Sequence, residues 1–442
     1  MTLRVAVFVH EFPALSETFV LNQITGLLDL GCDVRIFASG RRDESIEHTD
    51  IERYGLMRRV HYPGMPRSRL RRVIRAVPMV LQGLKRHPRR IFGAMNPFLY
   101  RRSALSLELL YWTDTLARHG QKFDVIFCHF GLIGRTVSFL RALGAIEGVL
   151  VTAFHGVDVS AVLAQRPGLY RHLFRHGDLF LPISHRWREA LILHGCDPNR
   201  AEVHHMGVEL PRFPFLPNRG ADDRSFRVLT IGRLVEKKGI EYGLRAVARA
   251  RERGTRIRYT IVGDGPLRGT LEALSDELGL GDSVTFAGWQ DQETVIALMQ
   301  GHQALLAPSV TDGVGDQEGI PVTLMEAMAV GLPVVSTRHS GIPELVENEK
   351  SGLLAEEGDV ESLADALMRL YADPALREAL GRKARGAVSR NFDVRALNER
   401  LVGIFEGLIR TRPEEVLDDR VVVRRGSNGA TPGAATPHDS RA

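Results

Sequence analysis

The feature that most constrains the fold is a repeated alternation between short apolar runs and longer segments with helical periodicity. In the first part of the chain the apolar runs are RVAVFV at 4–9, DVRIFA at 33–38, DVIFC at 124–128, GVLVTAF at 148–154 and LFLPI at 179–183. Short buried strands that alternate with helices are typical of a parallel sheet covered by helices on both faces. Residues 1–207 are therefore predicted to form a Rossmann-like domain.

The same alternation begins again after a proline-rich segment, ELPRFPFLPNRGADD at 209–223. The new runs are VLTIG at 228–232, YTIVG at 259–263, VTFAG at 284–288, ALLAP at 304–308 and PVVST at 333–337. A chain of 442 residues also exceeds the roughly 250–300 residues at which a single hydrophobic core stops growing. We predict a second Rossmann-like domain over 225–392, which makes the chain an α/β protein with two doubly wound domains facing a central cleft.

The C-terminal part of the chain divides into a helix and a tail. An amphipathic pattern over about 393–411 places apolar residues at Val394, Leu397, Leu401, Ile404, Phe405 and Leu408. This helix either completes the second domain or returns to cover the first, and periodicity does not distinguish the two. Residues 413–442 are rich in small and polar side chains, so we expect a disordered tail.

Composition favours a cytoplasmic protein. Three cysteines, Cys32, Cys128 and Cys196, lie far apart and in no metal-ligand spacing, which gives no sign of a disulfide framework or a zinc site. Neither a signal peptide nor a run of about 20 apolar residues is evident, so export and membrane spanning are not predicted.

The positive charge is concentrated in one region. The net charge is +5, yet no Asp or Glu occurs between Arg53 and Ser106, where arginines and lysines accumulate over 58–102. We call residues 58–102 the basic segment. Apolar residues at helical spacing alternate with its arginines, namely Val73, Ile74, Val77, Val80, Leu81 and Leu84. An RNA-binding surface, a solvated helix face and a helix on an anionic membrane all fit this pattern, and we favour the membrane.

Two glutamates mark the strongest candidate site. Glu318 and Glu326 lie eight residues apart in PSVTDGVGDQEGIPVTLMEAM, with Pro321 where a first helical turn would begin. Glu318 is then expected in the loop before the helix and Glu326 inside it. Acids are favoured at helix starts for dipole reasons alone, so two solvated carboxylates are the alternative interpretation.

A second cluster carries positive charge. Arg233 and Lys238 lie in GRLVEKKG, directly after the strand run VLTIG. Ligands of open α/β sheets bind beyond the carboxyl ends of strands, where two cations would suit the diphosphate of a nucleotide sugar. A solvated basic loop is the alternative, and Lys237 is interpreted as a solvated neighbour.

The motifs together resemble a known family. GRLVEKKG, VGDGPLRG, FAGW, EGIPVTLME, AMAVGLPVVST and SGIPELV occur in one order with plausible spacing. In this series the chain is similar to retaining glycosyltransferases of the GT-B type, the large family called group 1 or family 4. The segment FPALSETFVLNQI and the acidic GDQEGIPVTLMEAM resemble its exopolysaccharide branch, which includes colanic-acid type enzymes. The resemblance extends to about residue 410.

The resemblance implies roles for five residues. The first glutamate of the family's pair approaches the transferred sugar and the second bonds ribose hydroxyls, which map onto Glu318 and Glu326. An Arg and a Lys bind the diphosphate, which map onto Arg233 and Lys238. A histidine of the first domain contacts the donor sugar, and His155, in FHGVD after a strand run, matches it.

Further donor contacts are expected around these residues. The start of the helix after Glu318, made of Gly319, Ile320, Pro321 and Val322, would offer unpaired N–H groups to phosphate. Contacts are also expected from two post-strand turns, which contain Gly263, Gly265, Gly288 and Trp289. A tightly packed turn is the alternative for the glycines, and a half-buried packed aromatic is the alternative for Trp289.

The acceptor side is less well defined by the sequence. Many relatives carry a glycine pair in the first loop, where this chain has HEFPALS at 10–16. We assign acceptor contacts to Ser16, Glu17 and Thr18 in the first domain.

The predicted reaction moves a sugar from a nucleoside-diphosphate sugar to a hydroxyl acceptor with retention of configuration, in exopolysaccharide or cell-surface polysaccharide synthesis. The acceptor is expected to be a lipid-linked saccharide, and the enzyme to lie on the inner face of the cell membrane. No cofactor, no metal and no nucleic-acid partner are expected. Rival interpretations are a nucleotide-sugar epimerase or phosphorylase of the same fold, or a non-catalytic sugar-nucleotide or RNA-binding protein.

Overall fold

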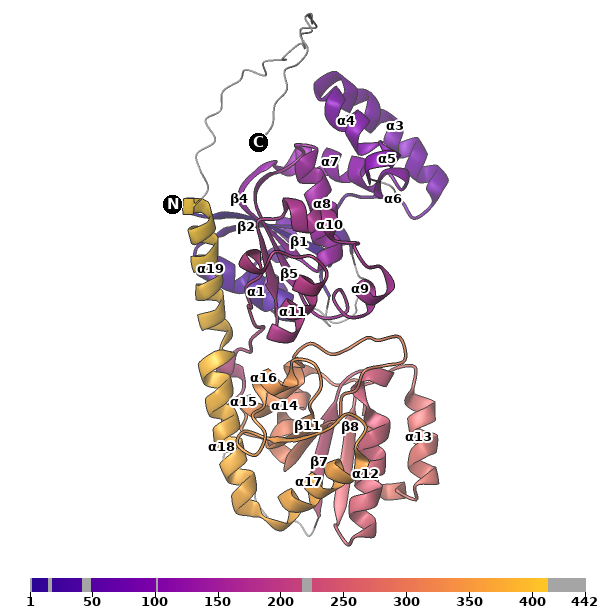
Figure 1. The fold of residues 1–442 in the computed structure, drawn as a ribbon, viewed down its shortest axis with the longest axis vertical. Helices are drawn as coiled ribbons and strands as arrows, with labels where there is room; N and C mark the ends of the chain where they lie inside the picture. The colour runs from indigo at the N-terminus through magenta and orange to yellow at the C-terminus, as the bar shows by residue number, and fades with distance from the viewer. Residues whose placement is uncertain (1, 15–17, 42–48, 101, 217–224, 412–442) are drawn as a thin grey trace, which may run out of the picture.

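Two six-stranded parallel sheets form the centres of two α/β domains in the computed structural model (Figure 1). The structure describes residues 2–14, 18–41, 49–100, 102–216 and 225–411. The first domain lies above the second in Figure 1, and two long C-terminal helices run along one side of both. The predicted α/β fold with two Rossmann-like domains is confirmed.

The first sheet has the order β3-β2-β1-β4-β5-β6. Its strands are β1 (Arg4–Glu11), β2 (Asp33–Gly40), β3 (Val60–His61), β4 (Lys122–His129), β5 (Glu147–Phe154) and β6 (Leu179–Pro182). All five predicted strand runs are found in it. The two-residue strand β3 was not predicted, because a two-residue strand carries no readable period.

The second sheet repeats this order as β12-β11-β10-β7-β8-β9. Its strands are β7 (Phe226–Ile231), β8 (Ile257–Val262), β9 (Val284–Gly288), β10 (Ala304–Ala307), β11 (Val334–Thr337) and β12 (Leu353–Ala355). The edge strand β12 was missed by the sequence analysis. In both sheets the strand order reverses next to the first strand, and ligands of doubly wound folds bind beyond that point.

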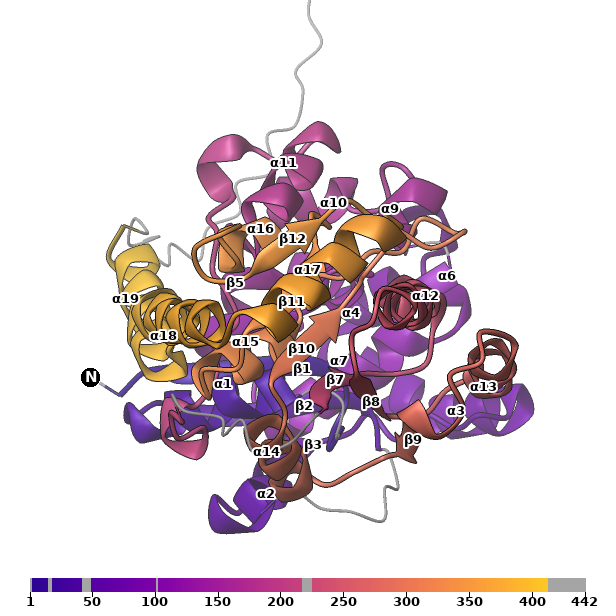
Figure 2. The ribbon, with the colours of Figure 1, turned by 90° about the horizontal axis from the view of Figure 1, so that it is seen from below.

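Helices cover both sheets, as Figure 2 shows from below for the second one. Those of the first domain are α1 (Thr18–Asp29), α2 (Thr49–Arg53), α3 (Arg69–Arg86), α4 (Pro88–Ala94), α5 (Pro97–Tyr100), α6 (Arg102–Leu105), α7 (Glu108–His119), α8 (Gly131–Ala142), α9 (Ala161–Gln165), α10 (Arg171–His176) and α11 (His185–Leu193). Those that follow are α12 (Ile240–Glu252), α13 (Arg268–Glu277), α14 (Gln292–Gly301), α15 (Val322–Ala329), α16 (Ile342–Leu345), α17 (Val360–Ala372), α18 (Pro374–Asn391) and α19 (Val394–Thr411). None of the helices in the described parts of the chain is long and apolar enough to span a bilayer.

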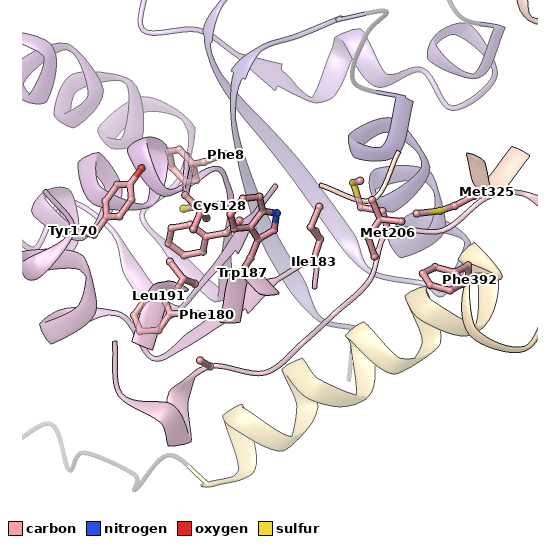
Figure 3. Close-up of a cluster of buried hydrophobic side chains, with 14 of the residues drawn as sticks. Phe8, Cys128, Tyr170, Phe180, Ile183, Trp187, Leu191, Met206, Met325 and Phe392 are labelled. Carbon is pink, nitrogen blue, oxygen red and sulfur yellow. The ribbon is translucent and has the colours of Figure 1, made fainter. Parts of the chain in front are cut away.

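The chain crosses between the domains at two adjacent places. Val208 leaves the first domain and pairs with the segment that joins α18 to α19, through Val208 N to Phe392 O at 2.9 Å and Val394 N to Val208 O at 3.1 Å. A Cβ on Gly207 would lie 2.7 Å from Phe392 O, so the close approach needs glycine. Met206, Met325 and Phe392 belong to one buried apolar cluster that continues from the first domain into the second (Figure 3).

Helix α19 packs on the first domain. Its buried Leu401 and Phe405 join the apolar core that contains the strands of the first sheet. The Phe405 ring lies 5.4 Å from that of Phe127 in β4, and Asn398 donates to the backbone oxygen of Asn22 in α1 at 3.2 Å. Of the two alternatives left open by the sequence, the structure shows the return to the first domain.

Removing the Phe405 ring should therefore destabilise the first domain. Phe405→Ala is expected to lower the free energy of unfolding by about 3–5 kcal/mol, because a fully buried ring is lost and a cavity remains. Urea unfolding measures this change. Glu399→Ala, on the exposed side of α19, is the control and should change the value by less than about 0.5 kcal/mol. Equal stability of the two variants would show that α19 does not hold the first domain together.

Candidate functional site

The loop between β10 and α15, residues 308–321, carries the first predicted glutamate, and we call it the acid loop. Glu318 is buried, with 9% of its surface exposed. Its Oε2 lies 3.0 Å from the Nζ of Lys238 and its Oε1 lies 3.6 Å from the Nζ of Lys237. Both lysines come from a 3-10 turn, Glu236–Lys238, that follows β7. Because β7 and β10 are neighbours in the sheet, their carboxyl-end loops meet and bring these charges together.

Lys237 is not the solvated neighbour that the sequence indicated. Its side chain is 14% exposed and its Nζ lies 2.9 Å from the Oδ2 of Asp316. The 3-10 turn ends at Gly239, where φ is 61° and a Cβ would lie 1.8 Å from Pro308 O. The turn is therefore pressed against the acid loop, which also donates from Val310 N to Lys237 O at 3.0 Å. That packing places both lysine side chains against the acid loop.

A histidine that the sequence analysis missed fixes the backbone of Glu318. The Nε2 of His339 accepts from the backbone N–H of Glu318 at 2.9 Å, and its Nδ1 lies 2.6 Å from the Oε1 of Glu357. The ring proton therefore lies on Nδ1 and is donated to Glu357. His339 is fully buried. Its one sequence signal is its place two residues after β11, at the same carboxyl edge of the sheet.

The electrostatic environment keeps Glu318 ionised. Burial acts to raise its pKa, but the attraction of Lys238 and Lys237 outweighs burial, and the pKa lies below its usual value. The alternative interpretation of a solvated carboxylate is wrong for this residue.

Glu326 has a different environment, inside α15. It is half-buried, and burial raises its pKa to about 7. Glu326 lines a narrow pocket together with Thr18 and Asn22 of α1, Val208 and Val322, so residues of both domains line this pocket. The two glutamates therefore differ in charge near neutral pH, one ionised and one near its midpoint.

Arg233 is exposed at the end of β7, two residues beyond the strand. No carboxylate among the described residues is paired with its guanidinium. Lys238 passes close to the same loop, since a Cβ on Gly232 would lie 3.1 Å from its Cε. The structure thus places Lys238 against Glu318 and leaves the Arg233 side chain in solvent beside them.

His155 lies directly after β5 and next to the acid loop. A Cβ on Gly319 would lie 2.8 Å from His155 O, so the two domains touch here. The His155 Nε2 lies 3.1 Å from the Nδ1 of buried His129, and the rings are 5.3 Å apart at 15°. Burial, with His129 and then His204, lowers the pKa of His155 well below its ordinary value, so the ring is neutral.

Asp158 and Ser160 hold the loop that carries His155, and no role was predicted for either of them. The Asp158 Oδ1 accepts from the backbone N–H groups of His155 at 3.0 Å and Gly156 at 2.9 Å, while its Oδ2 accepts from Gly131 N at 2.9 Å. Ser160 then crosses to the second domain and donates to the Oδ1 of Asp316 at 2.8 Å. The sequence did contain a signal for this role, namely the Asp of FHGVD three residues after His155. A short carboxylate side chain in a turn commonly accepts from nearby backbone N–H groups.

The predicted glycine turns bring backbone segments into close contact. Gly263 has φ of 125°, and a Cβ there would lie 2.0 Å from Gly232 O. A Cβ on Gly265 would lie 2.6 Å from Leu234 O. Both glycines thus hold the VGDGP turn against the loop of Arg233.

The turn after β9 lies at the same edge of the sheet. Gly288, with φ of 66°, pairs with Gly263. Trp289 is 65% exposed, so its interpretation as a half-buried packed aromatic is wrong.

The remaining predicted residues are placed as follows. Ser16 and Glu17 lie outside the described residues, and Thr18 is the first residue of α1. Ile320 is buried, Pro321 is the N-cap of α15, and the helix begins at Val322, one or two residues later than expected.

Comparison with known proteins gives consistent matches over the chain. The family model of Glycosyl transferases group 1 matches residues 215–387, and that of Glycosyltransferase Family 4 matches residues 16–212. The chain is 38% identical over 410 residues to WcaL of Salmonella typhimurium, which is named as a glycosyltransferase of colanic acid biosynthesis, covering 91% of this chain and 100% of WcaL. It is 36% identical over 412 residues to the amylovoran biosynthesis glycosyltransferase AmsK of Erwinia amylovora, covering 92% and 100%.

A solved structure shows the same fold. HepE of Anabaena in complex with UDP superimposes with a TM-score of 0.69 at 18% identity, covering 92% of this chain and 100% of HepE.

The raised pKa of Glu326 predicts a pH-dependent stability difference. The folded state binds the Glu326 proton up to a pKa of about 7, whereas the unfolded chain releases it near the ordinary glutamate pKa of 4.5. The free energy of unfolding of the wild type relative to Glu326→Gln should therefore fall as pH rises from about 4.5 to about 7, by about 3 kcal/mol. Urea unfolding across this range measures the difference. A difference that rises with pH, or stays flat, would show that burial does not hold this proton.

Proposed function

Because the chain belongs to the group 1, family 4 glycosyltransferases, we propose that Arg233, Lys238 and Glu318 act on a nucleoside-diphosphate sugar in the cleft between its domains. The chain is a retaining glycosyltransferase, homologous to enzymes of exopolysaccharide biosynthesis. The proposal concerns which residues hold the donor, what accepts the sugar and where the enzyme works.

The ion pair between Lys238 and Glu318 carries the donor-site proposal. It lies where β7 and β10 end, at the point of the second sheet where ligands of this fold class bind. A diphosphate brings about two negative charges, and one cation at ~4 Å contributes on the order of 4 kcal/mol at an effective dielectric of 20, before desolvation. Arg233 and the N–H groups at Gly319, Ile320 and the start of α15 would add donors. HepE, with the same fold, is described in complex with UDP.

The nucleotide is proposed to continue from the diphosphate toward α15. Glu326, inside that helix, would bond ribose hydroxyls. The turns at Gly263, Gly265 and Gly288 would approach the base, with Trp289 beside it. The exposure of the Trp289 ring supports its contact with the base, because the face of a solvent-exposed indole is free to contact a ligand.

The transfer itself is proposed as a front-face displacement. The bond between the anomeric carbon and the phosphate oxygen breaks, and the bond to the acceptor oxygen forms on the same face of the sugar. The acceptor proton passes to the departing phosphate, so no redox step is involved. Arg233 and Lys238 stabilise the growing phosphate charge, while Glu318 and neutral His155 orient the sugar from the two sides of the cleft.

Substitutions should separate binding from catalysis. Glu318→Gln is expected to keep UDP or GDP binding and to lower kcat for the nucleotide sugar by about 10²-fold or more, because the sugar loses its carboxylate contact. Lys238→Met is expected to weaken nucleoside-diphosphate binding as well. Calorimetry with UDP and GDP, and turnover of their sugars, measure the two effects. Lys383→Met, an exposed lysine of α18, is the control. Full turnover by Glu318→Gln would show that the Glu318 carboxylate takes no part in the transfer.

The acceptor is proposed to be a lipid-linked saccharide, handled at the first domain near Thr18 and the preceding Ser16 and Glu17. Two observations support this. WcaL and AmsK are named for polysaccharide biosynthesis, and Thr18 lines the same pocket as Glu326. The pocket thus brings the acceptor side of the first domain next to the proposed donor side.

Helix α3 of the basic segment suits the surface of an anionic membrane. One stripe of its apolar residues is exposed, at Leu70, Val73, Ile74, Val77 and Leu81, with exposed fractions from 53% to 71%. Exposed basic residues flank this stripe, including Arg71, Arg75, Lys85 and Arg86. Two of the predicted stripe residues, Val80 and Leu84, instead pack inward against the first domain. The enzyme is therefore proposed to be cytoplasmic and peripheral on the inner face of the membrane, without a nucleic-acid partner.

The membrane proposal predicts a position-specific effect. Ile74→Glu should lower binding to vesicles of phosphatidylglycerol and phosphatidylcholine by about tenfold, because a charge replaces an apolar group that enters the interface. Co-sedimentation measures the bound fraction. Leu193→Glu introduces the same charge at an 85% exposed leucine of α11 and should bind as the wild type does. Equal losses in both variants would indicate a net-charge effect rather than docking of α3.

A further inference from the structure

Lys237 and Lys238 share one carboxylate but are held in different ways. Lys237 meets Asp316 at 2.9 Å and Glu318 at 3.6 Å, and its backbone oxygen is bound to Val310 N. Among the described residues, Lys238 meets a single carboxylate, that of Glu318, at 3.0 Å. The Lys237 ammonium is therefore held by two carboxylates, whereas the Lys238 ammonium has one carboxylate contact that it can give up.

The position of Lys238 gives it a second destination. Its aliphatic chain passes Gly232 at the end of β7, beside the exposed Arg233, where the donor diphosphate is proposed to bind. Because its side chain is long and has three rotatable N–H donors, its ammonium can exchange the Glu318 carboxylate for phosphate oxygens. Glu318 would then lose its nearest cation at the moment when two negative charges arrive.

We propose that Lys237 is the positioning residue that keeps Glu318 ionised and in place while Lys238 is bound to the donor diphosphate. The inference rests on the proposed donor site and assigns to the neighbouring lysine a task that neither Arg233 nor Lys238 can perform. Asp316 holds Lys237 between the two carboxylates throughout the exchange.

The first domain is connected to this arrangement. Ser160 donates to the Oδ1 of Asp316 at 2.8 Å, and Gln317 N approaches the same hydroxyl at 3.4 Å. Asp316 therefore holds Lys237 with one oxygen and the loop of the first domain with the other. Lys237 is in position when the two domains are in contact, which is the state in which the sugar would be enclosed.

The groups that face Glu318 come from four elements. The 3-10 turn after β7 supplies Lys237 and Lys238, the acid loop supplies Asp316, the loop after β11 supplies His339, and the segment directly after β5 supplies His155. Both ring nitrogens of His339 are already engaged, because Nε2 accepts from Glu318 N and Nδ1 donates to Glu357. His155 is buried and neutral. Once Lys238 is engaged, Lys237 is the remaining cation within 4 Å of the Glu318 carboxylate among the described residues.

The test follows the protonation of Glu318 directly, apart from catalysis. Infrared difference spectra on adding UDP or GDP, recorded from pH 5 to pH 8, report a protonated carboxyl by its C=O band. The wild type should show no such band from Glu318, and a band from Glu326, which holds its proton up to about pH 7, is identified by its loss in Glu326→Gln. Lys237→Met should bind the nucleotide and gain the band, since loss of a cation within 4–6 Å raises a carboxyl pKa by about one pH unit or more. The band should vanish in Lys237→Met with Glu318→Gln, and Lys237→Arg should restore the wild-type spectrum.

The control is Lys122→Met, which removes an exposed ion pair of the same length, 3.6 Å to Glu147, and should leave the spectrum unchanged. A Lys237→Met protein that binds nucleotide without the band overturns the inference. Loss of nucleotide binding equal to that of Lys238→Met also overturns it, because Lys237 would then be a diphosphate ligand. Thermal unfolding confirms that each variant is folded. Failure of the wild type to bind either nucleotide would contradict the donor site itself.

Discussion

The buried carboxylate of Glu318 is stable because cations and a fixed backbone replace the water that it has lost. Desolvating an ion costs several kcal/mol unless well-placed partners compensate, and here Lys238 and Lys237 lie 3.0 and 3.6 Å away. With Asp316 the cluster holds two positive and two negative charges. In the proposed donor site, an arriving diphosphate would draw Lys238 away from Glu318 and so redistribute the charges of this cluster.

The repeated topology explains why these groups meet. Each sheet places its first and fourth strands side by side, so the loops after β7 and β10 converge although 80 residues separate Lys238 from Glu318. The corresponding edge of the first sheet supplies His155. Gly319 lets the acid loop approach the backbone of His155, where any side chain would collide with it. The topology thus brings these loops together, and a few glycines allow their backbones to approach closely.

The sequence predicted the architecture because buried parallel strands appear as short apolar runs, and ten of them were found. It failed for β3 and β12, which have two and three residues and therefore show no period. Glu318 was indicated by its spacing from Glu326 and Pro321, Lys238 by its place after a strand run, and His155 by its match to the family's histidine after a strand run. Whether Lys237 faces solvent depends on how the turn at Gly239 packs against Pro308, which no local pattern contains. His339 was missed for the same reason, because its partners Glu318 and Glu357 are distant in the sequence.

The connections between the domains are unequal in kind. On one side the chain crosses twice, through backbone pairing of Val208 with the segment between α18 and α19, next to buried apolar contacts. Helix α9, which begins directly after Ser160, lies on the side away from α18 and α19 in both Figure 1 and Figure 2. There Ser160 donates to Asp316, and Gln317 N approaches the same hydroxyl. Glu344 of α16 also accepts from the backbone N–H groups of His185 and Arg186 at the start of α11. A connection of backbone pairing and buried apolar contacts on one side, with separate polar contacts elsewhere, is an arrangement suited to hinged opening. Under the proposed donor site, closure would bring His155 to the sugar and anchor Asp316 in one motion, which would tie the charge state of Glu318 to the enclosure of the donor.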